Sequence, residues 1–195
     1  YIGVHIQGST SLNNVSRNNI YNCSDGVRFQ GGKPNNNIIA NNNMTDNNFA
    51  IRIGVDSQGN FNKIVNNIIT SSSGNGVELS AAYKTTVRNN TITVPFTGEG
   101  TCIGVHAGFA GIGSHNTTIM RNTVQGITPI CVTESDNNTI SDNVINQIWA
   151  NGVGAGIYLG KSSNNTVTLN VIQTSNNGIK GSLMNNSIFS GNFIN

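Results

Sequence analysis

The stretch NNTISDNVI, residues 137–145, contains a short phrase that recurs along the whole chain. In this phrase an apolar residue is followed by asparagine three positions later and by a second apolar residue two positions after that. Subtracting the positions of successive phrase asparagines gives spacings of 24, 25, 23, 32, 21, 27 and 22 residues. A repeat of this length predicts a solenoid. The eight copies are Val15-Asn18-Ile20, Ile39-Asn42-Met44, Ile64-Asn67-Ile69, Val87-Asn90-Ile92, Ile119-Asn122-Val124, Ile140-Asn143-Ile145, Val167-Asn170-Ile172 and Phe189-Asn192-Ile194.

A second phrase follows each copy and has the alternating pattern of a strand, usually opened by glycine. Alternation predicts strands, and the glycines and asparagine pairs between them predict turns, so we expect an all-β parallel solenoid. Leucine-rich repeats are excluded because the chain has only five leucines, and a hexapeptide solenoid is excluded by the long spacing. The second phrases are IGVHIQ (2–7), GVRF (26–29), AIRIG (50–54), GVELS (76–80), IGVHAG (103–108), PICVT (129–133), GIYLG (156–160) and GIKG (178–181).

Asparagine is the most conspicuous residue, with 36 copies among 195 residues. When coils stack about 4.8 Å apart, a residue at one corner lies directly above its counterpart in the next coil. Asparagine both donates and accepts hydrogen bonds, and it tolerates the left-handed backbone conformation of a tight corner. We therefore predict a structural ladder formed by the phrase asparagines, Asn18, Asn42, Asn67, Asn90, Asn122, Asn143, Asn170 and Asn192.

Composition excludes several classes of protein. Only 9% of the residues are charged and the net charge is +2, so the chain lacks the basic stripe of a nucleic-acid-binding protein. No apolar run approaches the roughly 20 residues that span a bilayer. Three cysteines fit no metal-ligand spacing; we interpret them as free thiols, with a Cys102–Cys131 bridge as the alternative. Both ends stop within the pattern, so residues 1–195 are expected to form a single domain of a longer chain.

The phrases NNTISDNVI (137–145) and NNTVTLNVI (164–172), followed by GIYLG and GIKG, resemble the repeats of the pectin-lyase-like superfamily of right-handed parallel β-helices. The resemblance is closest to the NosD-type, carbohydrate-binding and sugar-hydrolase branch, and it covers essentially the whole chain. It implies a right-handed single-stranded parallel β-helix of about eight coils, in an extracellular, cell-surface or virion protein. It selects no activity, because the superfamily includes lyases, hydrolases, epimerases, phage tailspikes and non-catalytic surface proteins.

Residues between the inward-facing pairs of the second phrase are expected to face solvent. They collect four charges, two histidines and a tyrosine, although the whole chain has only 10 Lys and Arg, 8 Asp and Glu and 3 His. Seven steps of about 4.8 Å make a stripe about 34 Å long, which suits an extended polymer. Corresponding positions beside the asparagine phrase, such as Ile68, Thr91 and Val144, carry no charged or histidine side chains. The stripe, called here the His106 column, consists of His5, Arg28, Arg52, Glu78, His106, Cys131, Tyr158 and Lys180.

The chemistry of the His106 column suits an anionic polymer of uronic acids. Hydrolysis is poorly supported, because a glycosidase needs two carboxylates at a set separation and the column offers only Glu78, with Asp25, Asp56 and Glu99 in flanking turns. In β-elimination or C5 epimerisation, Arg52 or Arg28 would neutralise the sugar carboxylate, and His106 and Tyr158 would act as base and acid. Glu78 would orient His106. Arg28 and Arg52 lie on adjacent coils and would repel each other unless an anion or Glu78 compensates them.

Further binding groups are expected around this column. Insertions near Arg52, on both sides of His106 and before Tyr158 are expected to rise as loops and turn the sheet into a groove. The substrate-binding residues are predicted to be Arg28, His5, Lys180 and Trp149. No metal and no cofactor are predicted: NosD-type relatives are associated with copper, but His5 and His106 would lie four coils apart, roughly 19 Å.

Two functions follow as hypotheses. The first is an extracellular carbohydrate-active module that binds, and in its strongest form cleaves or epimerises, an anionic polysaccharide or cell-surface glycan along the His106 column. The second is a non-catalytic structural or adhesive element, such as a tailspike shaft or a cell-surface spacer, for which a homo-oligomer is a further expectation.

Overall fold

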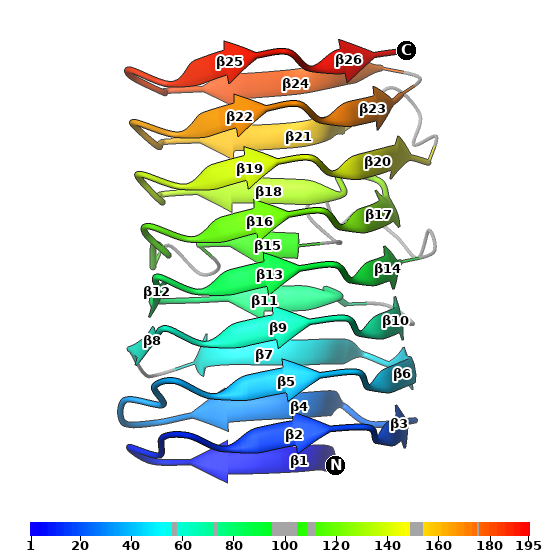
Figure 1. The fold of residues 1–195 in the computed structure, drawn as a ribbon, viewed down its shortest axis with the longest axis vertical. Helices are drawn as coiled ribbons and strands as arrows, with labels where there is room; N and C mark the ends of the chain where they lie inside the picture. The colour runs from blue at the N-terminus through cyan, green and yellow to red at the C-terminus, as the bar shows by residue number, and fades with distance from the viewer. Residues whose placement is uncertain (56–57, 72–73, 95–104, 109–111, 149–153, 175) are drawn as a thin grey trace.

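The computed structural model shows an all-β solenoid of parallel strands, as the repeat predicts (Figure 1). The structure describes residues 1–195 except 56–57, 72–73, 95–104, 109–111, 149–153 and 175. Three eight-stranded sheets run the length of the stack, so the expected number of about eight coils is close to the observed one. A two-stranded sheet joins Gly59–Asn60 (β8) to Ala82–Tyr83 (β12) at one corner.

Each coil contributes one strand to each of the three large sheets. Sheet 1 contains the second-phrase strands Ile2–Gln7 (β1), Asp25–Gln30 (β4), Phe49–Val55 (β7), Val77–Leu79 (β11), Val105–Ala107 (β15), Ile130–Thr133 (β18), Ala155–Gly160 (β21) and Asn177–Ser182 (β24). Sheet 2 contains Asn14–Ser16 (β2), Ile38–Ala40 (β5), Lys63–Val65 (β9), Thr86–Arg88 (β13), Thr118–Met120 (β16), Thr139–Ser141 (β19), Thr166–Thr168 (β22) and Ile188–Ser190 (β25). Sheet 3 contains Asn19–Tyr21 (β3), Asn43–Asn47 (β6), Ile68–Ser71 (β10), Thr91–Thr93 (β14), Thr123–Gly126 (β17), Val144–Gln147 (β20), Val171–Gln173 (β23) and Phe193–Ile194 (β26).

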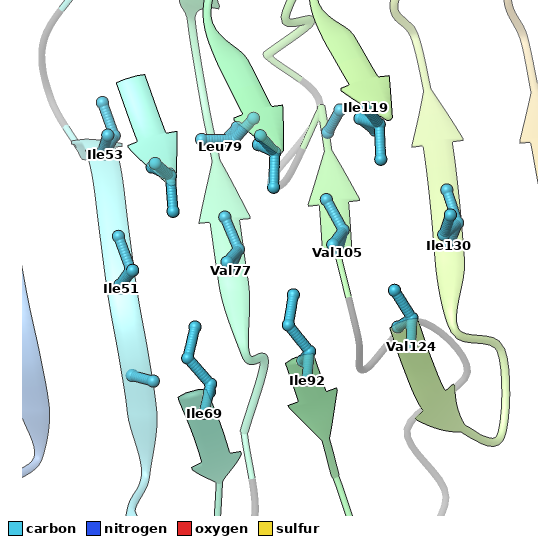
Figure 2. Packing of buried hydrophobic residues seen from close by; sticks show 14 of the residues in the cluster. Ile51, Ile53, Ile69, Val77, Leu79, Ile92, Val105, Ile119, Val124 and Ile130 are labelled. Carbon is cyan, nitrogen blue, oxygen red and sulfur yellow. The ribbon is translucent and has the colours of Figure 1, made fainter. Parts of the chain in front are cut away.

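The core is a set of aliphatic stacks that fills the space between the three sheets. Figure 2 shows Ile51, Val77 and Val105 of sheet 1 following one another from coil to coil, with Ile69 and Ile92 of sheet 3 nearby. All five are at most 1% exposed. The core therefore consists of the inward half of each alternating strand, which leaves the other half for the outer faces.

The asparagine ladder is confirmed and runs unbroken from Asn18 to Asn192. Asn67 illustrates the bonding. Its backbone N–H and its Nδ2 donate to Oδ1 of Asn90 at 2.9 and 3.0 Å, and its own Oδ1 accepts the same two bonds from Asn42. Its Nδ2 also donates to the carbonyl of Ile39 at 3.0 Å. Each amide thus satisfies buried groups that the strands leave open at the corner.

The left-handed conformation lies one residue before the ladder, which corrects the expectation for the ladder asparagines themselves. Asn66 has φ 56°, and the equivalent residues Arg121 and Leu169 have φ 54° and 57°. The ladder residue is held inside by its amide bonds, so the preceding residue makes the turn and points outward. Its side chain is therefore free to be arginine or leucine.

A second corner, between sheets 1 and 2, uses a related ladder that the sequence analysis does not predict. Asn13 donates to Asn37, Asn37 donates to Asn62, and further along the stack Asn138 donates to Asn165. The repeat is harder to detect here because threonine and serine replace asparagine in other coils. Two such corners fix the superposition of successive coils, on which the outer columns depend.

Candidate functional site

The structure places all eight residues of the His106 column in register on sheet 1. Arg28 pairs with His5 and Arg52, Glu78 pairs with Arg52 and His106, and Tyr158 pairs with Cys131 and Lys180. His106 pairs with Cys131 and so completes the column. The predicted vertical arrangement is therefore present, while the roles of these residues in binding or catalysis stay predictions.

The residues of the column differ in exposure, although all were expected to face solvent. His5 and Lys180 are exposed, and Arg28, Arg52, His106 and Tyr158 are partly buried. Glu78 and Cys131 are 0% exposed, so the expectation is wrong for both. Glu78 is covered because neighbouring polar side chains close over its carboxylate. Cys131 forms a disulfide, so the interpretation of three free thiols is wrong for it, whereas Cys23 is free; the alternative partner, Cys102, lies outside the described residues.

A chain of ion pairs joins the N-terminal part of the column to two groups beside it. Asp25, which is 1% exposed, accepts from Nη1 of Arg28 at 3.1 Å and from Nη1 of Arg52 at 3.3 Å. Nε of Arg52 donates to Oε1 of Glu78 at 3.0 Å, and Nδ2 of Asn75 donates to Oε2 of Glu78 at 3.0 Å. Every oxygen of the two carboxylates is thus engaged.

This chain of ion pairs changes the electrostatic argument for an anionic ligand. Two guanidinium groups and two carboxylates balance, so Asp25 and Glu78 compensate Arg28 and Arg52 without any external anion. The guanidinium of Arg52 also lies 4.2 Å from the ring centroid of Phe49. Removal of Arg52 would leave buried charge unpaired, which gives it a structural role.

Glu78 does not have the environment expected of a group that orients His106. Both of its oxygens are held by Arg52 and Asn75. Burial raises the pKa of Glu78, while the charge of Arg52 and the hydrogen bonds from Asn75 and Arg52 act in the opposite direction. The carboxylate is therefore a member of an internal network on the coil next to His106.

His106 is held by the coil that follows it. Its Nε2 lies 3.2 Å from Oγ1 of Thr133, and that hydroxyl donates to the carbonyl of Gly108 at 2.9 Å. Because the threonine proton is used in this way, Nε2 of His106 is the donor to Oγ1. Burial lowers the pKa of His106 to about 4, so the imidazole is neutral at pH 7.

The C-terminal part of the column offers an aromatic ring beside an open cation. A methyl group placed on Gly160 would lie 2.9 Å from both Cε1 and the hydroxyl oxygen of Tyr158, so the ring lies along the strand over this glycine. Lys180 is the register partner of Tyr158 on the next coil and is exposed. Among the described residues, Lys180 has no carboxylate partner.

Two families match the chain over more than half of its length. The family described as right handed beta helix region matches residues 1–110, and the family described as periplasmic copper-binding protein (NosD) matches residues 94–195. The chain belongs to the right-handed β-helix and NosD families. The predicted handedness and the resemblance to NosD-type repeats are thereby confirmed.

More distant comparisons add little to this family membership. A solved structure, described as a "putative glycosyl hydrolase" from Parabacteroides merdae ATCC 43184, has a TM-score of 0.48 and 10% identity. The similarity covers 84% of this β-helix and 83% of that chain, and at this level it carries no argument about function. No curated protein matches.

The copper named in the NosD description finds no suitable set of ligands in the described part of this β-helix. There, no group of three or more His, Cys, Asp or Glu side chains gathers. Nδ1 of His115 accepts the backbone N–H of Asp136 at 2.9 Å, and the sulfur of Cys131 is in a disulfide. The residues that the structure describes therefore do not fit a copper centre.

The NosD description places its members in the periplasm, in agreement with a location outside the cytoplasm. The described residues contain no helix long and apolar enough to cross a membrane.

Sequence reasoning did not identify every residue of the site. Asp25 and Asn75 lie three residues before Arg28 and Glu78, and this common offset is the signal that could have revealed them. Thr133 carried no such signal, because its contact with His106 depends on the stacking of β15 on β18. Trp149 and most of the predicted loop insertions lie outside the described residues.

Proposed function

We propose that the chain is a glycan-binding β-helix module that acts outside the cytoplasm, at the cell surface or beyond it. The ligand is an extended acidic polysaccharide of the uronate type, which is held on the His106 column at Tyr158 and Lys180. The observation that carries the proposal is the register of Tyr158 with the exposed Lys180 on adjacent coils, within a column that runs in register along the whole of sheet 1. A polymer that repeats along its length is the ligand that such a stripe accommodates best.

The C-terminal part of the column, with Tyr158 and Lys180, is called here the open half. Its side chains support a sugar ligand. Aromatic rings bind the apolar face of a ring-shaped ligand through packing, and the ring of Tyr158 lies beside Gly160 on the outer side of sheet 1. Lys180, on the next coil, supplies an exposed ammonium group for a carboxylate. This pair therefore binds one acidic sugar residue.

The N-terminal part of the column, in which Arg28, Arg52 and Glu78 are joined by ion pairs, is called here the sealed half. Together with His106, it favours glycan binding over catalytic turnover. Elimination or epimerisation needs a free cation at the sugar carboxylate and a base with a pKa near the working pH. Arg52 is already engaged by Asp25 and Glu78, and the pKa of His106 is about 4. The column therefore holds a glycan without the groups that would efficiently cleave or epimerise it.

The test is a binding titration with polyuronates and with neutral glycans of the same length. We expect the acidic glycans to bind to the wild type, and the Lys180→Ala and Tyr158→Ala variants to lose most of this binding. Lys63→Ala, which removes an exposed lysine from sheet 2, is the matched control and should bind normally.

Three results would overturn parts of this proposal. Equal loss of binding in Lys63→Ala would show an unspecific charge effect. Absence of binding to any acidic glycan would leave the structural or adhesive element as the function. Accumulation of unsaturated sugar product would show that the column is a lyase site.

A further inference from the structure

Sheet 3 presents an outer face that differs entirely from the His106 column. Two outward positions on each strand align in register through the stack. None of these positions carries a charge; the charged residue within a sheet 3 strand, Asp46, lies near the end of β6 with φ 54°. We call this surface the sheet 3 face; it consists of Asn19, Asn43, Ile68, Thr91, Thr123, Val144, Val171 and Phe193 in one column, and of Tyr21, Thr45, Thr70, Thr93, Gln125, Asn146 and Gln173 in the other.

Threonine and other β-branched residues dominate the middle of the sheet 3 face. Every residue of its first column is exposed, including Ile68 at 58% and Val144 at 50%. The central threonines present a hydroxyl and a methyl group side by side, and within the described residues none of these hydroxyls is hydrogen-bonded to another side chain or to backbone. These threonines are Thr45, Thr70, Thr91, Thr93 and Thr123.

The groups on the sheet 3 face are held at fixed spacings. β-branched side chains are restricted about χ1, so each hydroxyl and methyl has few orientations on the strand. The strands stack about 4.8 Å apart, and alternate residues along a strand lie about 6.6 Å apart. The two asparagine-containing corners keep successive coils superposed. The result is a rigid two-dimensional array in which threonines follow one another on up to three successive coils and are flanked by uncharged residues.

Tetrahedrally bonded water has a comparable spacing. Oxygen atoms joined by O–H···O bonds of about 2.75 Å at the tetrahedral angle have second neighbours about 4.5 Å away. Hydroxyls repeating about every 4.8 Å can therefore take part in an ordered layer of water, while the methyl groups lie between them. Ions organise water around themselves and would disrupt such a layer, so the lack of charge matters.

We propose that the sheet 3 face binds ice through an ordered layer of water on its threonine array. Thr91 and Thr93 lie at the centre of this array, between Thr70 and Thr123 on the adjacent coils. This activity is independent of glycan binding, because it uses the opposite kind of chemistry on a different sheet.

Other occupants fit the sheet 3 face less well. An acidic glycan finds no charge there. A crystalline neutral polysaccharide would call for aromatic rings along the face, but the two aromatic residues, Tyr21 and Phe193, lie on the first and last coils.

The test compares two lysine substitutions within one coil. Thr123→Lys places a charge in the sheet 3 face, and Thr118→Lys makes the same change on sheet 2. Purified wild-type chain and both variants are measured for thermal hysteresis and for partition of a fluorescently labelled sample into a growing ice hemisphere. We expect the wild type and Thr118→Lys to show both activities and Thr123→Lys to lose them, with all three equally folded by circular dichroism.

A second pair of variants separates the hydroxyl from the methyl contribution. Thr91→Val and Thr91→Ser should each weaken ice partition, and neither should affect binding of polyuronate to sheet 1. The proposal is overturned if the wild type leaves the freezing point and the ice crystals unchanged, or if Thr118→Lys and Thr123→Lys behave alike. It is also overturned if light scattering shows a dimer that Thr123→Lys dissociates, or if the chain binds crystalline chitin or cellulose and not ice.

Discussion

The two halves of the His106 column look similar in the sequence and differ in the structure. In the first half, Arg28 and Arg52 form ion pairs with Asp25, and Glu78 is held by an ion pair with Arg52 and a hydrogen bond from Asn75. In the second half, Tyr158 and Lys180 remain available to a ligand. The difference shows that a charged residue expected to face solvent can instead be paired with a buried carboxylate, as Arg28 and Arg52 are with Asp25.

The largest expected effect on stability comes from disrupting the ion pairs of the sealed half. Arg52→Ala removes a partner of both Asp25 and Glu78 and should lower the free energy of unfolding by about 3–5 kcal/mol, because buried carboxylates lose their cation. Urea denaturation of the variant measures the loss. Lys180→Ala, in the open half, should stay within about 0.5 kcal/mol of the wild type, and equal losses in the two variants would contradict the division of the column.

The second comparison is between an asparagine of the ladder and an asparagine on an outer face. Asn143→Ala removes the acceptor for Asn122 and the donor to Asn170, and should lower the free energy of unfolding by about 1–3 kcal/mol. Asn146→Ala, on the outer face of sheet 3, is the control and should have little effect. A harmless Asn143→Ala would show that the ladder does not hold the corner.

His106 lies between the two halves of the column, and its burial should appear in the pH dependence of stability. Its pKa falls from 6.5 to about 4 on folding, so the unfolded chain binds the proton more readily in this range. The stability contributed by neutral His106 is therefore present above pH 6.5 and is lost as the pH falls toward 4. Melting temperatures across this range should show a smaller decline for His106→Gln than for the wild type, and an unchanged decline would contradict the burial of this imidazole.

The smallest effect on stability is expected from Gly160→Ala. The new methyl group would lie 2.9 Å from the ring of Tyr158 and push the ring off the strand, while the backbone φ of residue 160 suits alanine. Unfolding should change little, whereas polyuronate binding should weaken. A variant that binds as tightly as the wild type would remove Tyr158 from the ligand site.

Most of the fold could be predicted from the sequence because each structural position recurs once per coil. Eight copies of Asn143 and its equivalents, at one corner, reveal the stacking directly. The His106 column could also be predicted, because its residues occupy equivalent positions on successive coils. Its internal pairing left only a weak signal, the offset of three residues between Asp25 and Arg28 and between Asn75 and Glu78, and the contact of Thr133 with His106 left none because it depends on the stacking of β15 on β18.

The most direct test of the central claim is an NMR titration of the isotopically labelled chain with a short oligouronate. The account predicts that backbone shifts concentrate in β21 and β24, around Tyr158 and Lys180, with the backbone of sheets 2 and 3 unaffected. Shifts centred on Arg28 and Arg52, or on another sheet, would contradict it.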